Sequence, residues 1–262
     1  MHIPVLSVIT VCFNACEELK QTLENVLTQE WIDYEYLVID GGSSDHTVSL
    51  LEHFAPLFEA KGISFSYTSE PDRGIYDAMN KGTRMASGKW LLFLNAGDLL
   101  CTPDVLKKIF TVPHQADILY GDTICIYQGN QKKYPALPLD HLAYEMAFCH
   151  QSAFVSHGLL LEYPYDISYK VCADHQFFLH MYLKKKTFEY VPFPVAVYEI
   201  SGFSDKNKLL SHQEKLRIQK EFGVFRVSPS WLLRELVFYL KYLIKSVFGQ
   251  KLINLVRKKR LR

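Results

Sequence analysis

Short apolar runs alternate with segments of helical periodicity over the first hundred residues. Continuous β-branched and apolar runs predict buried strands, whereas apolar residues three or four positions apart predict amphipathic helices. Parallel strands need a crossover connection, so this order predicts an α/β fold with a mostly parallel sheet and helices on both faces. The predicted strands are Val5–Phe13, Tyr34–Ile39, Ile63–Thr68 and Trp90–Leu94, and the predicted helices are Glu17–Gln29, Thr47–Ala60 and Tyr76–Ser87.

Three of these strands end in polar turns. Asn14 follows the first strand, Asp40 follows the second and Asp98 follows the fourth. The ligand crevice of an open α/β sheet lies outside the carboxyl ends of its strands, so we expect these side chains to converge. Asp98 follows a glycine, and a carboxylate with substrate phosphates suits Mg²⁺ or Mn²⁺. The pattern predicts a metal–phosphate site, and a solvated Asx turn is the structural alternative.

The second half of the chain is less regular. Asp174–Lys184 carries aromatic residues on one side and predicts a helix. Asp174 is then either its N-cap or a general base, because a carboxylate near a cleft can accept a proton from an attacking hydroxyl. The other elements expected here are short strands at Ile118–Tyr120 and Thr123–Tyr127, a turn at Gln128–Lys133 and a strand at Phe193–Ile200.

Further polar residues have both a functional and a structural interpretation. Asp40 precedes two glycines, which suits either close approach to a ligand or a tight turn. Asp45 is expected to cap the helix Thr47–Ala60. Arg73 enters a helix from a polar segment, where it can pair with phosphate or remain a solvated surface charge. His150 lies in an apolar segment and is either a buried core histidine or part of a metal site.

Composition and cysteine usage narrow the class of protein. The chain has 262 residues, of which 48% are hydrophobic and 14% aromatic, so it can bury a large core. Its six cysteines contain no C-x-x-C pair, and we expect free thiols in a reducing compartment. We also expect no signal peptide and no spanning helix, because no apolar window is long enough. The pair Gly41-Gly42 matches neither a P-loop nor the dinucleotide-binding pattern. This argues against a nucleoside triphosphate hydrolase and against a Rossmann dehydrogenase.

The C-terminal segment 229–262 is strongly basic. It has nine Lys or Arg residues and one acidic residue, whereas residues 1–228 have 20 basic and 27 acidic residues. Apolar residues fill much of the helical wheel beside the basic face, a pattern typical of helices that bind an anionic membrane surface. The alternative is a helix packed on the main domain or on a second copy. Because the basic residues are confined to this segment, the pattern argues against nucleic-acid binding.

Five short motifs follow one another in a fixed order. They are Ser7–Asn14, Tyr36–Thr47 with its Asp-Gly-Gly-Ser-Ser-Asp turn, Asp77–Gly82, Leu94–Asp98, and the later pair Phe148–Gln151 and Ala173-Asp174. Together they resemble the family 2 inverting glycosyltransferases of GT-A fold. The Asn-Ala-Gly-Asp turn, with Asp-Arg-Gly-Ile-Tyr-Asp-Ala-Met-Asn before it, resembles a branch associated with bacterial surface-polysaccharide assembly.

The resemblance implies a set of site residues. Thr10, Asn14 and Asp40 would line the nucleoside pocket, and Asp98 would bind Mn²⁺ or Mg²⁺ on the diphosphate. Asn95 would face the ribose or the donor sugar. The general base would be Asp174.

The resemblance also implies a reaction and an organisation of the chain. A sugar would pass from a nucleotide-diphospho-sugar, with UDP favoured, to a lipid-linked or oligosaccharide acceptor. We expect residues 1–100 to bind the donor and 101–228 to face the acceptor, with 229–262 as a membrane-binding tail. The protein would then work in the cytoplasm, at the inner face of the cell membrane.

The chain departs from the family pattern at three places. Asn95 and Ala173 stand where acids are usual, and Gly41 stands where many relatives have a second Asp. These changes leave open a degenerate nucleotide-sugar-binding subunit without activity. A sugar-nucleotide nucleotidyltransferase is a further alternative, but it would require a Gly-rich basic loop that residues 14–18 lack.

Overall fold

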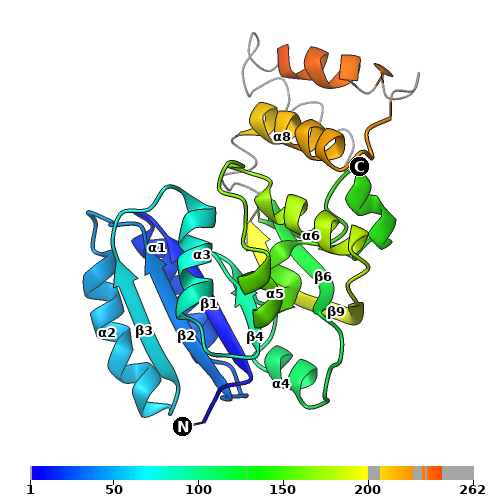
Figure 1. Cartoon of the computed structure of the whole chain (residues 1–262). Coiled ribbons are helices and arrows are strands. Elements are labelled where there is room, and N and C mark those ends of the chain that lie inside the picture. Colours follow the sequence, from blue (N-terminus) through cyan, green and yellow to red (C-terminus); the bar gives the residue numbers. More distant parts are fainter. Residues whose placement is uncertain (1, 128, 200–206, 227–231, 234, 244–262) are drawn as a thin grey trace. The chain divides into compact units, whose positions relative to one another are not determined.

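The computed structural model describes residues 2–127, 129–199, 207–226, 232–233 and 235–243. These residues belong to two compact units, Met1–Asn207 and Lys208–Arg262, whereas the sequence suggested a boundary at residue 228. The first unit is a sheet with helices, and the second contains helix α8 (Lys208–Glu221) (Figure 1). The expected α/β class with helices on both faces is confirmed.

The described residues of the first unit form one nine-stranded sheet. Its order is β3-β2-β1-β4-β8-β6-β9-β5, with β7 paired to β6. The first four strands are parallel, as expected, whereas β8 lies antiparallel between β4 and β6. The strands are β1 (Leu6–Cys12), β2 (Tyr34–Asp40), β3 (Ser64–Ser69), β4 (Trp90–Phe93), β5 (Leu99–Leu100), β6 (Ile118–Tyr127), β7 (Asn130–Tyr134), β8 (Ala153–Ser156) and β9 (Phe188–Glu199).

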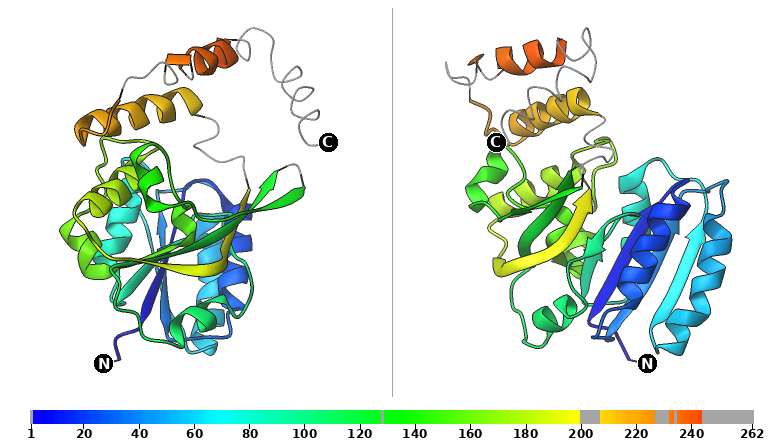
Figure 2. Two further views of the ribbon diagram at one scale, coloured as in Figure 1. Left: turned by 90° about the vertical axis from the view of Figure 1, so that its right-hand side faces the viewer. Right: turned by 180° about the vertical axis from the view of Figure 1, so that it is seen from behind.

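Helices cover both faces of the parallel strands (Figures 1 and 2). On one face, α1 (Cys16–Leu27) and α2 (Thr47–Ala60) share a core with side chains of β1 and β2. On the other face, α3 (Ile75–Met85) approaches β1 so closely that a Cβ at Gly82 would lie 2.6 Å from Ile9 Cγ2. Alternate strand residues therefore enter different helical layers, as the period of two requires.

The remaining helices lie in the second half of the first unit. The α-helices there are short, except for α6, and two 3-10 helices precede β8. They are α4 (Val105–Phe110), η1 (Leu139–Ala143), η2 (His150–Ser152), α5 (His157–Glu162) and α6 (Ala173–Leu183).

The structure corrects two expectations in the region after residue 117. Strand β6 is continuous from Ile118 to Tyr127, because a shift in its register with β9 on both sides of Asp122 absorbs the break expected there. The predicted turn at 128–133 contains most of β7, whose residues are all exposed. An edge strand with four polar residues in a row lacks the alternation by which strands are predicted from sequence.

The start of α2 also differs from the expectation. The N-cap residue is His46, not Asp45, and it makes no side-chain cap hydrogen bond. Asp45 Oδ1 still accepts a hydrogen bond from the Thr47 backbone nitrogen at 3.0 Å. Asp45 thus accepts a hydrogen bond from the first turn of α2, although it lies one position before the N-cap residue.

Two leucines of α2 test how much of the stability comes from the layer between α2 and the sheet. Leu51 is 0% exposed and Leu57 is 41% exposed. Leu51→Ala should lower the free energy of unfolding by about 2–5 kcal/mol, because it leaves a cavity in the core. Leu57→Ala, on the same helix, should change it by no more than about 0.5 kcal/mol. Urea denaturation measures both, and equal losses would contradict the layer described here.

Candidate functional site

The turns that follow β1 and β2 are joined by side-chain hydrogen bonds. Asn14 has a left-handed backbone with a φ of 48°. Its side-chain Oδ1 accepts a hydrogen bond from the Ser44 backbone nitrogen at 2.9 Å, and its own backbone nitrogen donates to Ser43 Oγ at 2.7 Å. Asn14 is exposed at this edge. The two strand ends thus present one polar rim, which contains Asn14 and Asp40 of the three residues expected to converge.

Asp40 is the buried centre of that rim. Its Oδ2 accepts hydrogen bonds from the Ser43 backbone nitrogen at 2.9 Å and from Ser69 Oγ at 2.6 Å. Its Oδ1 accepts from the Ser43 hydroxyl and from the Cys12 thiol. Asp40 is 0% exposed, so its carboxylate shapes the turn from within the protein.

Thr10 and Arg73 have different environments. Thr10 is fully buried in β1, and its hydroxyl lies 2.9 Å from the hydroxyl of Tyr36 on β2. The side chain of Arg73 is 73% exposed, and its NH2 atom lies 3.1 Å from Asp77 Oδ1. The Asp77 carboxylate raises the pKa of Arg73 and orients the guanidinium beside the first turn of α3. Arg73 is thus a fixed surface cation, whereas Thr10 belongs to the sheet interior.

Asp98 closes a tight turn after β4. Its Oδ2 accepts a hydrogen bond from the Asn95 backbone nitrogen at 3.0 Å, and Gly97 has a φ of 94°, which favours glycine. Thr22 of α1 braces the turn by donating to the Asp98 carbonyl at 3.0 Å. The side-chain Oδ1 of Asn95 is buried and has no hydrogen-bond partner. A buried carboxylate and a buried unpartnered amide oxygen therefore belong to the same turn.

Burial dominates the electrostatics of Asp98. It raises the pKa of this carboxyl from 3.8 to about 6, because a low-dielectric site disfavours the charged form. The charge of His150 and hydrogen bonds from Gln151 and the Asn95 backbone act in the opposite direction. A bound cation would favour the charged carboxylate at this position.

Asp174 is close to this turn through His150. Asp174 Oδ2 lies 3.4 Å from His150 Nδ1, and its Oδ1 lies 2.9 Å from the Tyr76 hydroxyl. His150 Nε2 in turn lies 3.3 Å from Asn95 Nδ2. The N-cap of α6 is Cys172, so the interpretation of Asp174 as a helix cap is wrong. The structure brings Asn95, Asp98, His150 and Asp174 into one cluster.

The charges in this cluster support one another. Burial opposes a charge on His150, but the neighbouring carboxylates of Asp174 and Asp98 outweigh it and raise the pKa of the imidazole. Burial likewise opposes a charge on Asp174, but His150, the His175 backbone nitrogen and Tyr76 lower the pKa of its carboxyl. At neutral pH Asp174 is therefore an ionised acceptor of protons.

The residues of the turn fit a divalent cation that is shared with a substrate. The described part of the chain contains no group of three His, Cys, Asp or Glu residues able to hold a metal by themselves. Asp98 and the unpartnered Asn95 Oδ1 nevertheless supply two oxygen donors. Mg²⁺ commonly takes one or two protein carboxylates and completes its shell with water and substrate phosphates. The donor set thus suits a metal that binds together with a phosphate ligand.

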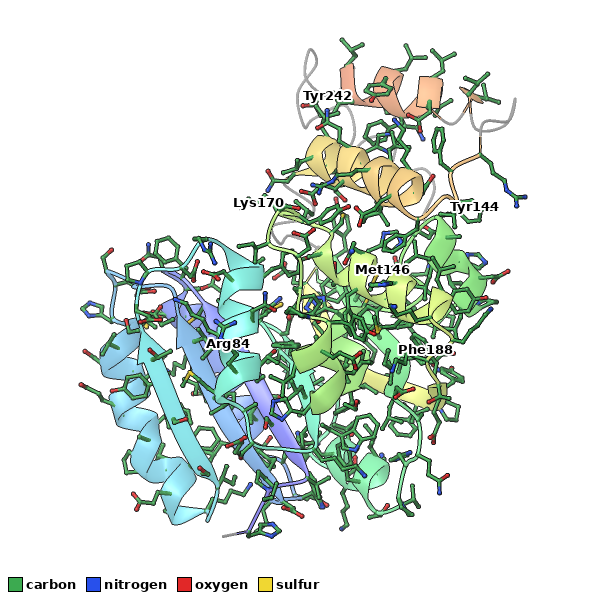
Figure 3. All side chains as sticks on the ribbon, in the orientation of Figure 1. Arg84, Tyr144, Met146, Lys170, Phe188 and Tyr242 are labelled. Carbon is green, nitrogen blue, oxygen red and sulfur yellow. The ribbon has the colours of Figure 1, made fainter. Side chains whose placement is uncertain are left out.

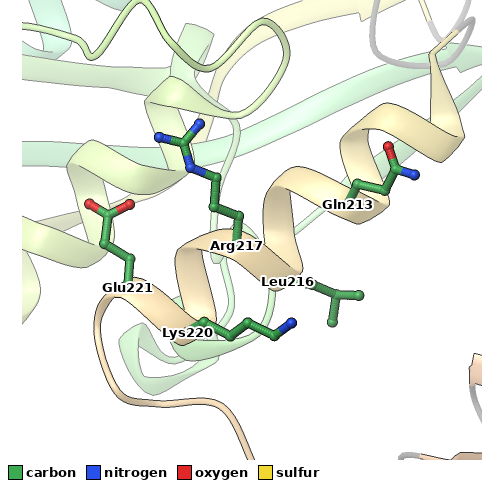
Figure 4. A pocket seen from close by; sticks show the side chains of 5 residues that line it. All are labelled: Gln213, Leu216, Arg217, Lys220 and Glu221. Carbon is green, nitrogen blue, oxygen red and sulfur yellow. The ribbon is translucent and has the colours of Figure 1, made fainter.

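A separate hollow lies on the second unit (Figure 4). It is lined by residues of a single helix, α8, and they supply mixed charges and one leucine. A site requires polar groups that converge from several elements, which this surface lacks. The lining residues are Gln213, Leu216, Arg217, Lys220 and Glu221.

Three residues near the candidate site were not predicted from the sequence. Tyr76 contacts Asp174, Gln151 donates to Asp98, and Phe13 is a 62% exposed aromatic residue at the end of β1. A Cβ at Gly41 would lie 3.3 Å from the Phe13 ring, so this ring lies against the turn after β2. An aromatic residue immediately before Asn14 was a signal that the sequence offered.

Comparisons with known proteins identify the family of the chain. Residues 7–161 match the family model described as Glycosyl transferase family 2. A PGL/p-HBAD biosynthesis glycosyltransferase of Mycobacterium bovis is 36% identical over 181 residues, which cover 68% of this chain and 69% of the relative. An uncharacterized glycosyltransferase of Mycobacterium tuberculosis is 33% identical over 185 residues, which cover 67% and 68%.

Two solved structures share the fold. TarS of S. aureus (residues 1–349), solved in complex with UDP, is similar with a TM-score of 0.61 and 19% identity, covering 83% of this chain and 70% of TarS. The mannosyltransferase PcManGT of Pyrobaculum calidifontis, solved with GDP-Man and Mn²⁺, has a TM-score of 0.65 and 16% identity, covering 87% and 67%. The first unit thus has the architecture of GT-A glycosyltransferases.

Asp98→Asn should stabilise the protein above pH 6. Since the folded pKa is about 6 and the ordinary value is 3.8, folding takes up a proton between them. The contribution of Asp98 to the free energy of unfolding therefore falls as the pH rises from about 4 to about 6. The uncharged amide avoids this loss, and the gain should approach about 3 kcal/mol at pH 7.

Denaturation between pH 4 and pH 8 measures this gain, which should disappear toward the acidic end. Asp104→Asn is the matched control. Lys108 lowers the pKa of Asp104, so replacing the Asp104 carboxylate should not stabilise the protein. If Asp98→Asn has a lower free energy of unfolding than the wild-type protein at pH 7, the charged Asp98 carboxylate does not destabilise the fold.

Proposed function

This chain belongs to glycosyl transferase family 2, and on that basis we propose that it is an inverting enzyme of cell-surface polysaccharide synthesis. It would transfer a sugar from a nucleotide-diphospho-sugar, with UDP as the favoured nucleotide, to a lipid-linked or oligosaccharide acceptor. The observation that carries the proposal is the cluster that joins Asp98 to Asp174 through Asn95 and His150.

The donor would bind at the carboxyl edge of the parallel strands. The rim formed by Asn14 and the turn after Asp40 faces this edge, and the exposed ring of Phe13 offers a surface on which a base can stack. The guanidinium of Arg73 can pair with a phosphate. TarS was solved with UDP and PcManGT with GDP-Man, which supports a nucleotide ligand for this fold.

Asp98 and Asn95 would hold Mn²⁺ or Mg²⁺ together with diphosphate oxygens of the donor. When bound, this cation supplies charge stabilisation to the leaving nucleoside diphosphate. PcManGT was solved with Mn²⁺, which supports a divalent cation in this fold. Burial of Asp98 excludes water and strengthens its interaction with any charge that forms there.

Asp174 would serve as the general base. The acceptor hydroxyl oxygen would bond to the anomeric carbon from the face opposite the diphosphate, while the carbon–oxygen bond to the diphosphate breaks. The diphosphate would leave with the electron pair of that bond, and the hydroxyl proton would pass to Asp174. A single displacement of this kind inverts the anomeric centre. The hydrogen bonds from His150 and Tyr76 keep the carboxylate ionised and oriented for this step.

A screen of UDP-, GDP- and dTDP-sugars tests the proposal, with release of the nucleotide as the measured signal. Turnover should occur with one nucleotide class, should require Mn²⁺ or Mg²⁺ and should stop on chelation. Asp98→Ala should abolish the effect of the metal on donor affinity in a calorimetric titration. Donor binding without turnover on any acceptor would favour the degenerate binding subunit instead.

Asp174→Asn separates catalysis from binding in the same assay. A base acts in the transition state, so the variant should lose on the order of 10²–10⁴-fold in kcat and bind the nucleotide nearly unchanged. Asp166→Asn, a few residues before α6 and outside the cluster, is the control and should keep normal turnover. Near-normal turnover by Asp174→Asn would refute its assignment as the base.

The second unit carries the proposed membrane contact. Residues 232–233 and 235–243 are helical, and the rest of segment 229–262, including its basic end, lies outside the described residues. Glu235 and Phe238 pack on His212 of α8, with a 2.8 Å hydrogen bond to Glu235 and rings 3.9 Å apart. Leucines between positions 232 and 240 remain 47–61% exposed, and Figure 3 labels Tyr242 on the same helix. One side of this helix thus packs on α8 and its leucines stay exposed, which supports the proposal of a membrane contact.

An apolar surface beside a basic segment suits the cytoplasmic leaflet of a membrane, where anionic lipids attract Lys and Arg. In the part of the chain that the structure describes, no helix is long and apolar enough to cross a membrane. We propose a peripheral contact, which would hold the enzyme near a lipid-linked acceptor at the inner face of the cell membrane.

Replacing Leu233, Leu236 and Leu240 together by Gln should release the protein from vesicles that contain anionic lipid. High salt should release the wild-type protein only in part, because salt screens the charges and not the apolar contact. The control is Leu57→Gln with Leu161→Gln, two exposed leucines of the first unit. Donor affinity should not change in either variant. Failure of the wild-type protein to sediment with the vesicles would show that the membrane proposal is wrong.

A further inference from the structure

Two side chains from distant parts of the chain hold the carboxylate of Asp174. The Tyr76 hydroxyl and the His175 backbone nitrogen both lie 2.9 Å from Oδ1. On the other oxygen, His150 Nδ1 lies 3.4 Å from Oδ2. The single Tyr76 hydroxyl hydrogen is shared between Oδ1 and the Val171 carbonyl oxygen, which lies 2.8 Å from that hydroxyl. Oδ2 has His150 as its partner and keeps a lone pair for a substrate proton. The position of Oδ2 depends on His150.

The far side of the His150 ring is also held. Its Nε2 lies 3.3 Å from Asn95 Nδ2, and the Asn95 backbone nitrogen donates to Asp98 Oδ2 at 3.0 Å. Hydrogen-bonded groups therefore run from Asp98 in the turn after β4 to Asp174 in the first turn of α6. The ring is a bridge between the carboxylate proposed for the donor and the carboxylate proposed for the acceptor.

Asn95 determines which ring nitrogen of His150 carries hydrogen. With the Asn95 amide nitrogen donating to Nε2, the neutral ring must carry its hydrogen on Nδ1, which faces Asp174. His150 therefore presents Nδ1–H to Asp174, and Asn95 Oδ1 stays available to a cation.

We propose that His150 is a positioning residue that aims Oδ2 of Asp174 at the acceptor hydroxyl, and that Asn95 sets the orientation of the ring. This inference rests on the proposed role of Asp174 as the base. In a Ser-His-Asp triad a carboxylate orients a histidine base. Here a histidine would orient a carboxylate base. It also gives Asn95 a function that an aspartate would not serve equally, because a carboxylate has no hydrogen to donate to Nε2.

Three substitutions of His150 test the proposal by geometry. In His150→Asn the amide nitrogen is attached to Cγ, as Nδ1 is, so a donor toward Asp174 is retained. In His150→Gln the amide lies one bond further out, and His150→Ala has no donor. The Gln and Ala variants should lose on the order of 10–100-fold in kcat with an unchanged donor KM, and His150→Asn should keep most of the wild-type kcat.

A double variant shows whether His150 acts through Asp174. Once the base is removed, its orientation no longer matters, so His150→Ala with Asp174→Asn should be no slower than Asp174→Asn alone. If the double variant loses kcat by the product of the two single losses, the proposal is overturned. A raised donor KM with unchanged kcat in His150→Ala would overturn it as well, because the ring would then serve Asp98.

Nitrogen NMR of the wild-type protein supplies a readout that needs no activity. The His150 signals, assigned by their loss in His150→Asn, should show a hydrogen on Nδ1, and an unprotonated Nδ1 would overturn the proposal. The two levels of inference also fail separately. Normal turnover by Asp174→Asn refutes the proposed base, whereas an inactive Asp174→Asn beside a fully active His150→Ala refutes only the role of His150.

Discussion

The imidazole of His150, held between two buried carboxylates, joins the two halves of the catalytic unit. Asp98 belongs to the turn after β4, and Asp174 belongs to α6 in the second half of the first unit. Neither carboxylate is stable as an isolated charge away from water. The carboxylates in turn raise the pKa of the His150 imidazole between them.

The parallel strands supply the rigid support that this cluster needs. Asp98 follows β4, the neighbour of β1, and Thr22 of α1 holds its turn from one side. The layers above and below are filled with apolar side chains, so the turn has little freedom to move. Burial of Asp98 nevertheless raises its pKa to about 6, which costs stability at neutral pH. The core tolerates that cost, and a metal bound with a phosphate ligand would recover it.

The C-terminal unit leaves apolar side chains exposed. In the described residues, one side of its helix 235–243 packs on α8 through His212, and leucines of the helix are exposed to solvent. Exposed leucines of this kind are costly unless something covers them, and contiguous apolar patches on soluble proteins commonly mark interaction surfaces. The basic residues nearby in the sequence make an anionic lipid surface a fitting partner.

The alternation of strands and helices up to residue 100 was predictable from the sequence, because parallel strands buried on both faces need continuous apolar runs. The polar residues at the strand ends were predictable for the same reason, since their positions follow from the strands. By contrast, β7 was not predicted, because an exposed edge strand has no apolar pattern.

The connections within the site came only from the tertiary structure. Tyr76 and Asp174 are 98 positions apart, and no local signal records their contact. The sequence likewise left His150 between a core histidine and a ligand, and Asp174 between a cap and a base. Each of these choices depends on which side chains of other elements lie within hydrogen-bond distance, and only packing of the two halves determines that. The sequence by itself determined the strands and helices up to residue 100 and the polar residues at the strand ends, whereas the folded chain decided which of those groups contact one another.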